Sequence, residues 1–249
     1  MKLKNAKIVV FDFDGTLVAP NQSTTWERIW IELGYSISDC AYFYEKFSNK
    51  EITHKQWFKL TESKFKEAGM TMNTLKRIAA EMELISGCKE TLLELKKRGA
   101  LLYIVSGSIQ EVINEVLGDA INLFEDVSAN KVCFRNGKLS RIIETAYDYE
   151  GKADYIKRIV NENKVDASDI LFIGNSFNDT FVHLSGARTL CINPENTEYK
   201  NPMYWHNYIK NVEDLREVLP YVFSEQNKDV REPLDYTQEN SVEIKHIMW

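Results

Sequence analysis

Two aspartates, Asp12 and Asp14, follow an apolar run near the start of the chain, in the stretch VVFDFDGTLV. Ionised carboxylates are costly to bury unless they are paired or bound to a cation. The pair Asp14–Gly15 also suits a tight turn, so a simple reversal of the chain is the plainest explanation. The second aspartate and the Thr-Leu that follows indicate instead a site that uses both carboxylates.

Polar residues also follow two later apolar runs. Ser106 and Gly107 come after LLYIV, and a group from Asn175 to Asp179 comes after ILFIG. The carboxyl ends of parallel strands meet at one edge of a sheet, where ligands bind. We therefore expect these groups to converge with the two aspartates. Lys152, at the start of a predicted helix, would add a cation there.

Two carboxylates and an amide oxygen suit a hard cation such as Mg²⁺. A hydroxyl, backbone N–H groups near a helix start and a lysine suit a phosphate. The aspartates are thus predicted to hold a metal and to attack a phosphorus atom. Plain structural explanations remain open: Ser106 could cap a helix, Lys152 could be a solvated lysine, and Asp179 could be an ordinary acid at a helix N-terminus.

Short apolar runs without polar alternation are typical of strands buried on both faces of a parallel sheet. Four such runs occur, at 7–11, 101–105, 170–174 and 189–192. Helical spacing between and after them predicts helices at 88–98, 108–117, 150–163 and 211–219. Alternating strands and helices predict an α/β fold with a doubly wound, mostly parallel sheet.

One long stretch, from about 22 to 84, shows only amphipathic helix and many aromatic residues. Insertions of this size usually form a layer of their own. We predict a small helical cap at 19–85, a core made of 1–18 and 86–223, and a C-terminal tail at 224–249. Aromatics in such an insertion are more often core than substrate contacts, but Trp26 and Trp30 are candidates for contacting a substrate.

A second irregularity, KVCFRNGKLSRII at 131–143, places Asn136–Gly137 between two short runs. This dipeptide is the strongest short hairpin signal. The stretch therefore predicts a hairpin beside the sheet.

The composition limits the possible partners. A net charge of -6 argues against a basic surface for nucleic acid, and no apolar run is long enough for a membrane span. The start of the chain shows no signal peptide. The four cysteines lie far apart and without paired spacing, which predicts free, buried thiols and a cytoplasmic protein: Cys40, Cys88, Cys133 and Cys191. The sequence does not specify the oligomeric state.

Four segments resemble the motifs of the haloacid dehalogenase superfamily of hydrolases. They are DFDGTL (12–17), VSGS (105–108), GKADYI (151–156) and GNSFND (174–179). The wider pattern over much of 85–180 is similar to the phosphoserine-phosphatase-like branch, and the helical insertion matches its cap in position and length.

The resemblance implies a role for each matching residue. Asp12 would be the nucleophile that forms an aspartyl-phosphate, and Asp14 the general acid and base. The phosphate would be bound by Ser106, Gly107, Lys152 and Asn178, with Lys152 also offsetting charge on the nucleophile. The cofactor Mg²⁺ would be bound by Asp12, the backbone carbonyl of Asp14, Asn175 and Asp179.

The chain departs from this pattern at two places. The fourth motif usually opens with Gly-Asp, whereas here it is Gly174–Asn175, and a neutral amide should bind Mg²⁺ less tightly. The acid that pairs with the substrate ammonium in phosphoserine phosphatases has no counterpart before Glu27. Arg28 is the only arginine between 1 and 76, so no residue can be assigned to a substrate carboxylate.

The leading hypothesis is a Mg²⁺-dependent phosphatase that hydrolyses a small phosphorylated metabolite. A phosphotransferase would share every motif and stays an alternative. Asn175 keeps open a non-catalytic binding protein on the same scaffold. Haloacid dehalogenation needs no acid at the position of Asp14, which argues against it.

Overall fold

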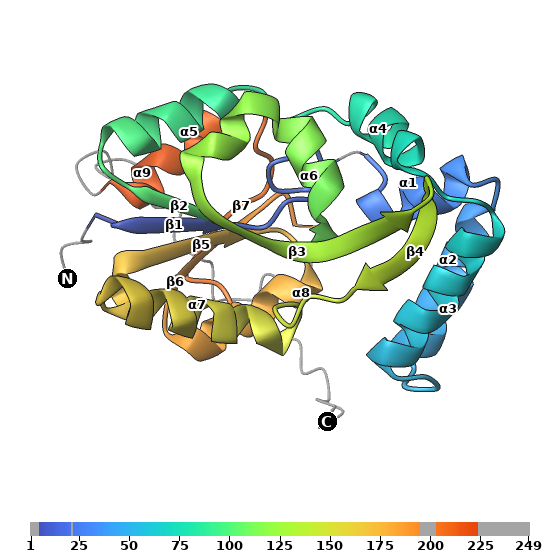
Figure 1. Cartoon of the computed structure of the whole chain (residues 1–249). Helices are drawn as coiled ribbons and strands as arrows, with labels where there is room; N and C mark the ends of the chain where they lie inside the picture. The colour runs from blue at the N-terminus through green and yellow to red at the C-terminus, as the bar shows by residue number, and fades with distance from the viewer. Residues whose placement is uncertain (1–4, 21, 195–202, 224–249) are drawn as a thin grey trace.

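A seven-stranded sheet forms the centre of the computed structural model, which describes residues 5–20, 22–194 and 203–223 (Figure 1). The strand order is β4-β3-β2-β1-β5-β6-β7. All neighbouring strands are parallel except β3 and β4, which form an antiparallel hairpin. The strands are β1 (Ile8–Phe11), β2 (Leu101–Ile109), β3 (Phe124–Arg135), β4 (Lys138–Ile143), β5 (Ile170–Gly174), β6 (Arg188–Ile192) and β7 (Asn207–Ile209).

The central strand β1 is fully buried because both faces of the sheet are covered. Val9 and Phe11 belong to one hydrophobic core, whereas Ile8 and Val10 belong to the other. Parallel strands covered on both faces read as continuous apolar runs, as this one does. The predicted doubly wound α/β fold is confirmed.

Helices α5, α6 and α9 lie on one face of the sheet, and α7 and α8 lie on the other (Figure 1). Their bounds are α5 (Cys88–Lys97), α6 (Gln110–Leu117), α7 (Glu150–Asn163), α8 (Phe177–Thr180) and α9 (Leu219–Val222). Short 3₁₀ turns join them at Gly118–Leu123, Ala167–Asp169, Phe181–Ser185 and Leu215–Val218.

Two predicted helix boundaries were wrong. The helix expected at 108–117 begins only at Gln110, because strand β2 continues to Ile109. The helix expected at 211–219 is a 3₁₀ turn and α9, together spanning 215–222. The Val212 N–H donates to the Asn193 side chain at 2.6 Å, which holds this stretch outside the helix, and Asp214 caps the turn that follows.

Four helices form the insertion between β1 and α5, at the edge where the central strands end (Figure 1). They are α1 (Thr25–Glu32), α2 (Ile37–Ser48), α3 (His54–Glu67) and α4 (Met72–Ala80). Each begins at a Ser or Thr whose side chain accepts the N–H three residues later, so four separate caps start the helices. An antiparallel bridge between Val18 and Leu84 joins the two ends of the insertion.

The predicted hairpin is present, and it supports the insertion. Asn136 and Gly137 both have positive φ, as its two-residue turn requires. The Ile142 N–H of β4 donates to the Glu62 carboxylate of α3 at 2.7 Å, and the Leu139 N–H donates to the Met70 carbonyl at 2.9 Å. The helical insertion is therefore anchored to the sheet at a second place.

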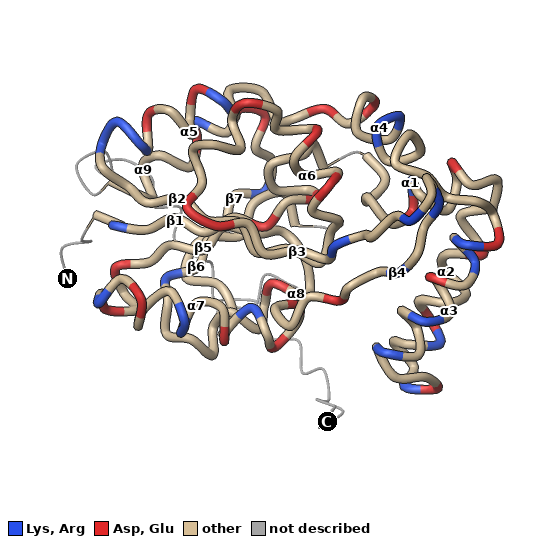
Figure 2. The backbone as a smooth tube through the Cα atoms, viewed as in Figure 1, with Lys and Arg blue, Asp and Glu red and all other residues tan. Residues whose placement is uncertain are grey.

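Other predictions can be compared with the described residues. Cys40, Cys88 and Cys191 are buried and form no disulfide, as expected, whereas Cys133 is half-buried. Along the outer helices α2, α3 and α5, Lys and Arg alternate with Asp and Glu rather than gathering on one element (Figure 2). Across 5–20, 22–194 and 203–223, no helix has the length and apolar character needed to cross a bilayer. The predicted tail at 224–249 lies outside the described residues.

The core of the insertion supplies a stability prediction. Phe65 of α3 is completely buried and its ring packs against Trp26 and Trp30. Truncating it to alanine leaves a cavity, so Phe65→Ala should lower the free energy of unfolding by about 3–5 kcal/mol. On the same helix Leu60 is 40% exposed, and Leu60→Ala should cost about 0.5 kcal/mol or less. Urea unfolding of both variants measures the difference; equal losses would contradict the packing.

Candidate active site

Asp12 and Asp14 lie directly beyond the carboxyl end of β1. The Asp12 N–H donates to the Ile173 carbonyl at 2.9 Å, so the chain still runs beside β5 at this point, and the side chain is buried. Asp14 is half-buried. Its Oδ1 accepts from the backbone N–H of Thr25 at 3.2 Å and from the Thr25 hydroxyl at 2.9 Å. Asp14 therefore connects the end of the strand to the first turn of α1.

Gly15 makes the close approach of this loop to β5 possible. Its φ of +71° lies in the left-handed region, and a Cβ there would lie 2.2 Å from the Asn175 Nδ2. Asn175 in turn accepts a hydrogen bond from the Thr16 hydroxyl through its Oδ1, at 3.2 Å. The loop after β1 and the loop after β5 are therefore packed directly against each other.

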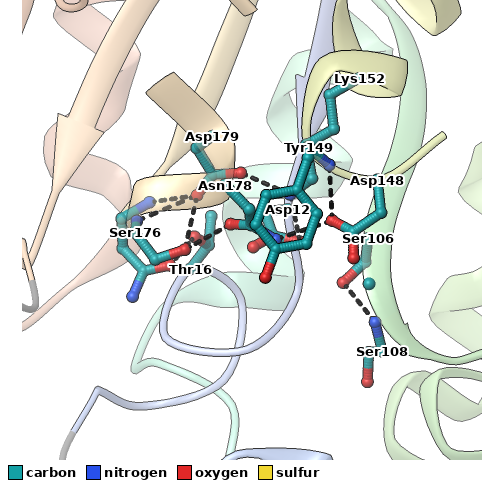
Figure 3. Close-up of polar contacts among 12 residues, drawn as sticks. Asp12, Thr16, Ser106, Ser108, Asp148, Tyr149, Lys152, Ser176, Asn178 and Asp179 are labelled. Carbon is teal, nitrogen blue, oxygen red and sulfur yellow. Dashed lines mark hydrogen bonds and ion pairs between the residues drawn. The ribbon is translucent and has the colours of Figure 1, made fainter. Parts of the chain in front are cut away.

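Lys152 forms ion pairs with Asp12, at the start of the first loop, and with Asp179, in the short helix α8 that follows the second loop. Its side chain is completely buried, and its Nζ lies 2.5 Å from the Asp179 Oδ1 and 3.2 Å from the Asp12 Oδ1 (Figure 3). A buried ammonium persists only beside such partners. The explanation of Lys152 as a solvated surface lysine is therefore excluded.

Asp179 combines the structural and the electrostatic roles that the sequence left open. Its Oδ2 accepts from the Ser176 N–H at 3.0 Å, as part of the capping box of α8, and also from the Asn175 N–H at 2.9 Å. Its Oδ1 accepts from Lys152. Both carboxylate oxygens are thus engaged by this chain's own donors, which sets Asp179 apart from Asp12.

Ser106 and Gly107 belong to the last part of β2, so Ser106 does not cap α6. The Gly107 carbonyl accepts from the Trp26 indole N–H at 2.8 Å and from the Asn130 amide at 2.6 Å. These two donors fix the peptide group between Gly107 and Ser108. The segment predicted to bind phosphate is therefore held from β3 and from helix α1.

Burial and neighbouring charges shift the pKa values of the ionisable groups in the site. Burial, followed by the charge of Asp179, raises the pKa of Asp12, while Lys152 opposes the shift. Burial likewise raises the pKa of Asp14, against the hydrogen bonds from Thr25 and Ser108. Burial by itself would lower the pKa of Lys152, but the carboxylates of Asp12, Asp179 and Asp148 together raise it. Negative charge exceeds positive charge around Asp12.

The donor set can be compared with the needs of Mg²⁺. The Asp12 Oδ1 is buried and accepts no hydrogen bond, and excess negative charge surrounds it. Within the described ranges no three His, Cys, Asp or Glu side chains gather as a metal site. Oxygen ligands besides carboxylates would have to contribute, and the Asn175 amide and the backbone at Asp14 are available for this. With those oxygens included, the residues present fit a hard cation.

A cavity of about 570 Å³ opens above these residues. Its polar floor includes Asp12, Asp14, Ser106, Gly107 and Asn178. Aromatic side chains of α1 and α3, among them Trp26, Trp57 and Phe58, form part of its wall. Most of the residues singled out from the sequence thus lie around one cavity.

Of the two candidate tryptophans, Trp30 lies away from the cavity. It is 1% exposed, packs against Tyr35, Phe43 and Phe65, and does not line the cavity. The expectation that Trp30 contacts a substrate does not agree with this position, because the helix turns its ring into the core of the insertion. Trp26, four residues earlier, does line the cavity.

Sequence reasoning missed Asp148 and Asn130. Asp148 lines the cavity, accepts from the Asn178 amide at 2.9 Å and lies so close to Gly107 that a Cβ there would be 2.5 Å from its Oδ2. The only signal for Asp148 is its spacing of four residues before Lys152. Nothing in the sequence marks Asn130, because its contact with Gly107 depends on strand pairing.

A model of the haloacid dehalogenase-like hydrolase family matches residues 9–180, more than half of the chain. The chain belongs to this family. The phosphoserine phosphatase of Methanocaldococcus jannaschii is 24% identical over 222 residues, which cover 88% of this chain and 99% of that relative. The predicted membership of the superfamily, on its phosphoserine-phosphatase-like branch, is confirmed.

Solved structures of this hydrolase family share the fold. A phosphoserine phosphatase determined as a phospho-aspartyl intermediate analogue aligns with a TM-score of 0.71 at 22% identity, over 88% of this chain and all of that one. A family hydrolase from Salmonella enterica serovar Typhi aligns with a TM-score of 0.74 at 18% identity, over 91% of this chain and 73% of that one. At such identities the likeness shows the fold alone.

The buried lysine supplies a prediction for this hydrolase. Lys152→Met leaves Asp12 and Asp179 buried without their cation, so the free energy of unfolding should fall by about 3–5 kcal/mol. Lys157→Met, on the same helix at a side chain that is 54% exposed, should cost about 0.5 kcal/mol or less. Chemical unfolding in chelating buffer measures both. A Lys152→Met variant as stable as the native chain would show that the ion pairs do not hold the site together.

Proposed function

We propose that this hydrolase is a Mg²⁺-dependent phosphatase that acts on a small phosphate monoester through an aspartyl-phosphate. The observation that carries the proposal is the position of Asp12. Its buried carboxylate lies against Lys152 at the floor of a large cavity, and Asp14 follows two residues later. The full-length relative named phosphoserine phosphatase supports a phosphate ester as the substrate class.

In the first step Asp12 attacks the phosphorus atom, and the bond between phosphorus and the ester oxygen breaks. Lys152 offsets negative charge on the nucleophile and on the phosphoryl oxygens, and Ser106 and the Gly107 N–H bind those oxygens. Asp14 donates a proton to the leaving oxygen. Its pKa, raised by burial, favours the protonated form that this step needs.

In the second step water attacks the phosphorus of the aspartyl-phosphate. Asp14, now ionised, accepts a proton from that water. Inorganic phosphate leaves and the Asp12 carboxylate is restored. Because Asp14 is hydrogen-bonded to Thr25, its carboxylate keeps one orientation through both steps.

Mg²⁺ would be held by Asp12, the Asp14 backbone carbonyl and Asn175, and it would screen the repulsion between a carboxylate and a phosphate dianion. In this proposal Asp179 acts through Lys152 and the loop at 174–176, because both its oxygens already accept hydrogen bonds. Asn178, which lines the floor, is assigned to the phosphate.

The helical insertion at 19–85 is proposed as the cap that encloses the substrate. Trp26 supports this role, since its ring lines the cavity while its N–H reaches the Gly107 carbonyl. Closing such a layer over a substrate would exclude water from the reacting groups. A cytoplasmic location stays a prediction.

The proposed nucleophile is tested by Asp12→Asn, which keeps the shape and removes the attacking oxygen. Turnover of p-nitrophenyl phosphate should fall by more than about a thousandfold. Asp169→Asn is a matched control, because Asp169 is also a buried aspartate but lies before β5, whereas Asp12 lies directly after β1. Phosphate release by both variants decides the role; an Asp12→Asn variant with near-native turnover would rule out the mechanism.

The acid role of Asp14 predicts a dependence on the leaving group. Asp14→Asn should slow the hydrolysis of an alkyl phosphate by about 10²–10⁴-fold, but p-nitrophenyl phosphate much less, since its leaving group needs little protonation. Steady-state rates on both substrates give the comparison. If both substrates slowed equally, Asp14 would have no role in proton transfer.

Asn175 predicts weak binding of Mg²⁺. Asn175→Asp adds one negative charge beside the cation, partly offset by desolvation, so the half-saturating Mg²⁺ concentration should fall by roughly tenfold. Asn193→Asp changes another buried amide, after β6, and should leave that concentration unchanged. Titrating Mg²⁺ against phosphate release measures both. Equal half-saturation in native and Asn175→Asp proteins would remove Asn175 from the metal site.

A further inference from the structure

The cavity of this hydrolase carries an excess of acidic side chains. Four of its lining residues are acidic: Asp12, Asp14, Glu27 and Asp148. Glu27 lies on the first turn of α1, where its carboxylate accepts from the Thr24 N–H at 2.7 Å and is thereby held in place. In the proposed reaction the charges of the phosphate and of Mg²⁺ offset each other. The organic part of the substrate would then lie near Glu27, whose negative charge no lysine or arginine among the described lining residues offsets.

No lysine or arginine is among the described residues that line this cavity. Lys152 lies beneath the floor, with no exposed surface and two carboxylates beside it. Arg28 lines a separate hollow with Glu32 and donates to the Ser23 carbonyl and the Gln22 side chain. Its charge lowers the pKa of Asp14, but its side chain does not line the cavity. The lining histidine, His54, already has an acidic partner, because its Nδ1 lies 2.6 Å from the Glu144 carboxylate.

The upper wall of the cavity is aromatic. Trp26 meets Trp57 and Phe58 edge to face, with ring centroids 5.2 and 5.6 Å apart. Phe47 of α2 and Tyr149, which precedes α7, also line the cavity and meet edge to face with ring centroids 5.7 Å apart. Aromatic rings bury apolar groups favourably, and the partial negative charge of their faces attracts cations and disfavours anions.

We infer that the cavity selects phosphate monoesters whose organic group is apolar or cationic, and that it discriminates against those with a second anionic group, phosphoserine among them. The inference rests on the proposed phosphatase function. An added carboxylate would meet Glu27 and aromatic rings, and no lysine or arginine among the described lining residues could receive it. An ammonium or an aromatic ring would find an acidic or an apolar partner there.

Two matched pairs of substrates test the inference on the native chain. O-phosphoethanolamine and O-phosphoserine differ by one carboxylate, as do phenyl phosphate and 4-carboxyphenyl phosphate. In each pair kcat/KM should be at least about tenfold higher for the ester without the carboxylate, because like charges repel strongly in a partly buried site. A ratio of one or below in either pair overturns the inference.

Two variants of helix α1 test whether Glu27 causes the preference against substrates that carry a carboxylate. Glu27→Gln keeps an oxygen that can accept from Thr24 and removes the charge, so it should reduce both ratios several-fold. Glu32→Gln removes a charge from the same helix at a residue that pairs with Arg77 outside the cavity, and should leave both ratios as they are. Ratios that Glu27→Gln does not change also overturn the inference. A native chain that releases no phosphate even from p-nitrophenyl phosphate would contradict the proposed function instead, so the two failures are distinguishable.

Discussion

The contact of the buried Lys152 amine with the carboxylates of Asp12 and Asp179 is the interaction on which the site depends. An ammonium with no exposed surface needs both partners to offset its loss of hydration. Because the three residues come from α7, from the end of β1 and from α8, the same contact fixes the relative positions of three elements. Stability and chemistry therefore rest on one cluster of charges.

The helical insertion also contacts the site at the end of the sheet. Asp14 accepts two hydrogen bonds from Thr25, and the Trp26 indole donates to the Gly107 carbonyl. Two consecutive residues of α1 thus contact the proposed acid and the proposed phosphate-binding segment. A displacement of α1 would disturb both groups together. The insertion therefore contributes to the geometry of the site as well as to the shape of the cavity above it.

Local patterns predicted the parts of the molecule that local chemistry determines. Strand β1, the Asn136–Gly137 turn and the convergence of Asp12, Ser106 and Asn178 follow from buried apolar runs, turn chemistry and the rule for parallel strand ends. The partners of Asp148 and Asn130 could not be predicted, since they depend on which loops and which strands meet in space. Trp30 was misplaced for the same reason: helical spacing does not say which of two tryptophans faces the core.

The most direct test of the account traps the covalent intermediate in the native chain. Borohydride added during turnover of p-nitrophenyl phosphate with Mg²⁺ reduces an acyl phosphate, so an aspartyl-phosphate becomes homoserine. The account predicts homoserine at residue 12, formed only when substrate is present, as read by mass spectrometry of the peptide that carries it. Continued release of phosphate with Asp12 unmodified, or homoserine at a different aspartate, would contradict it.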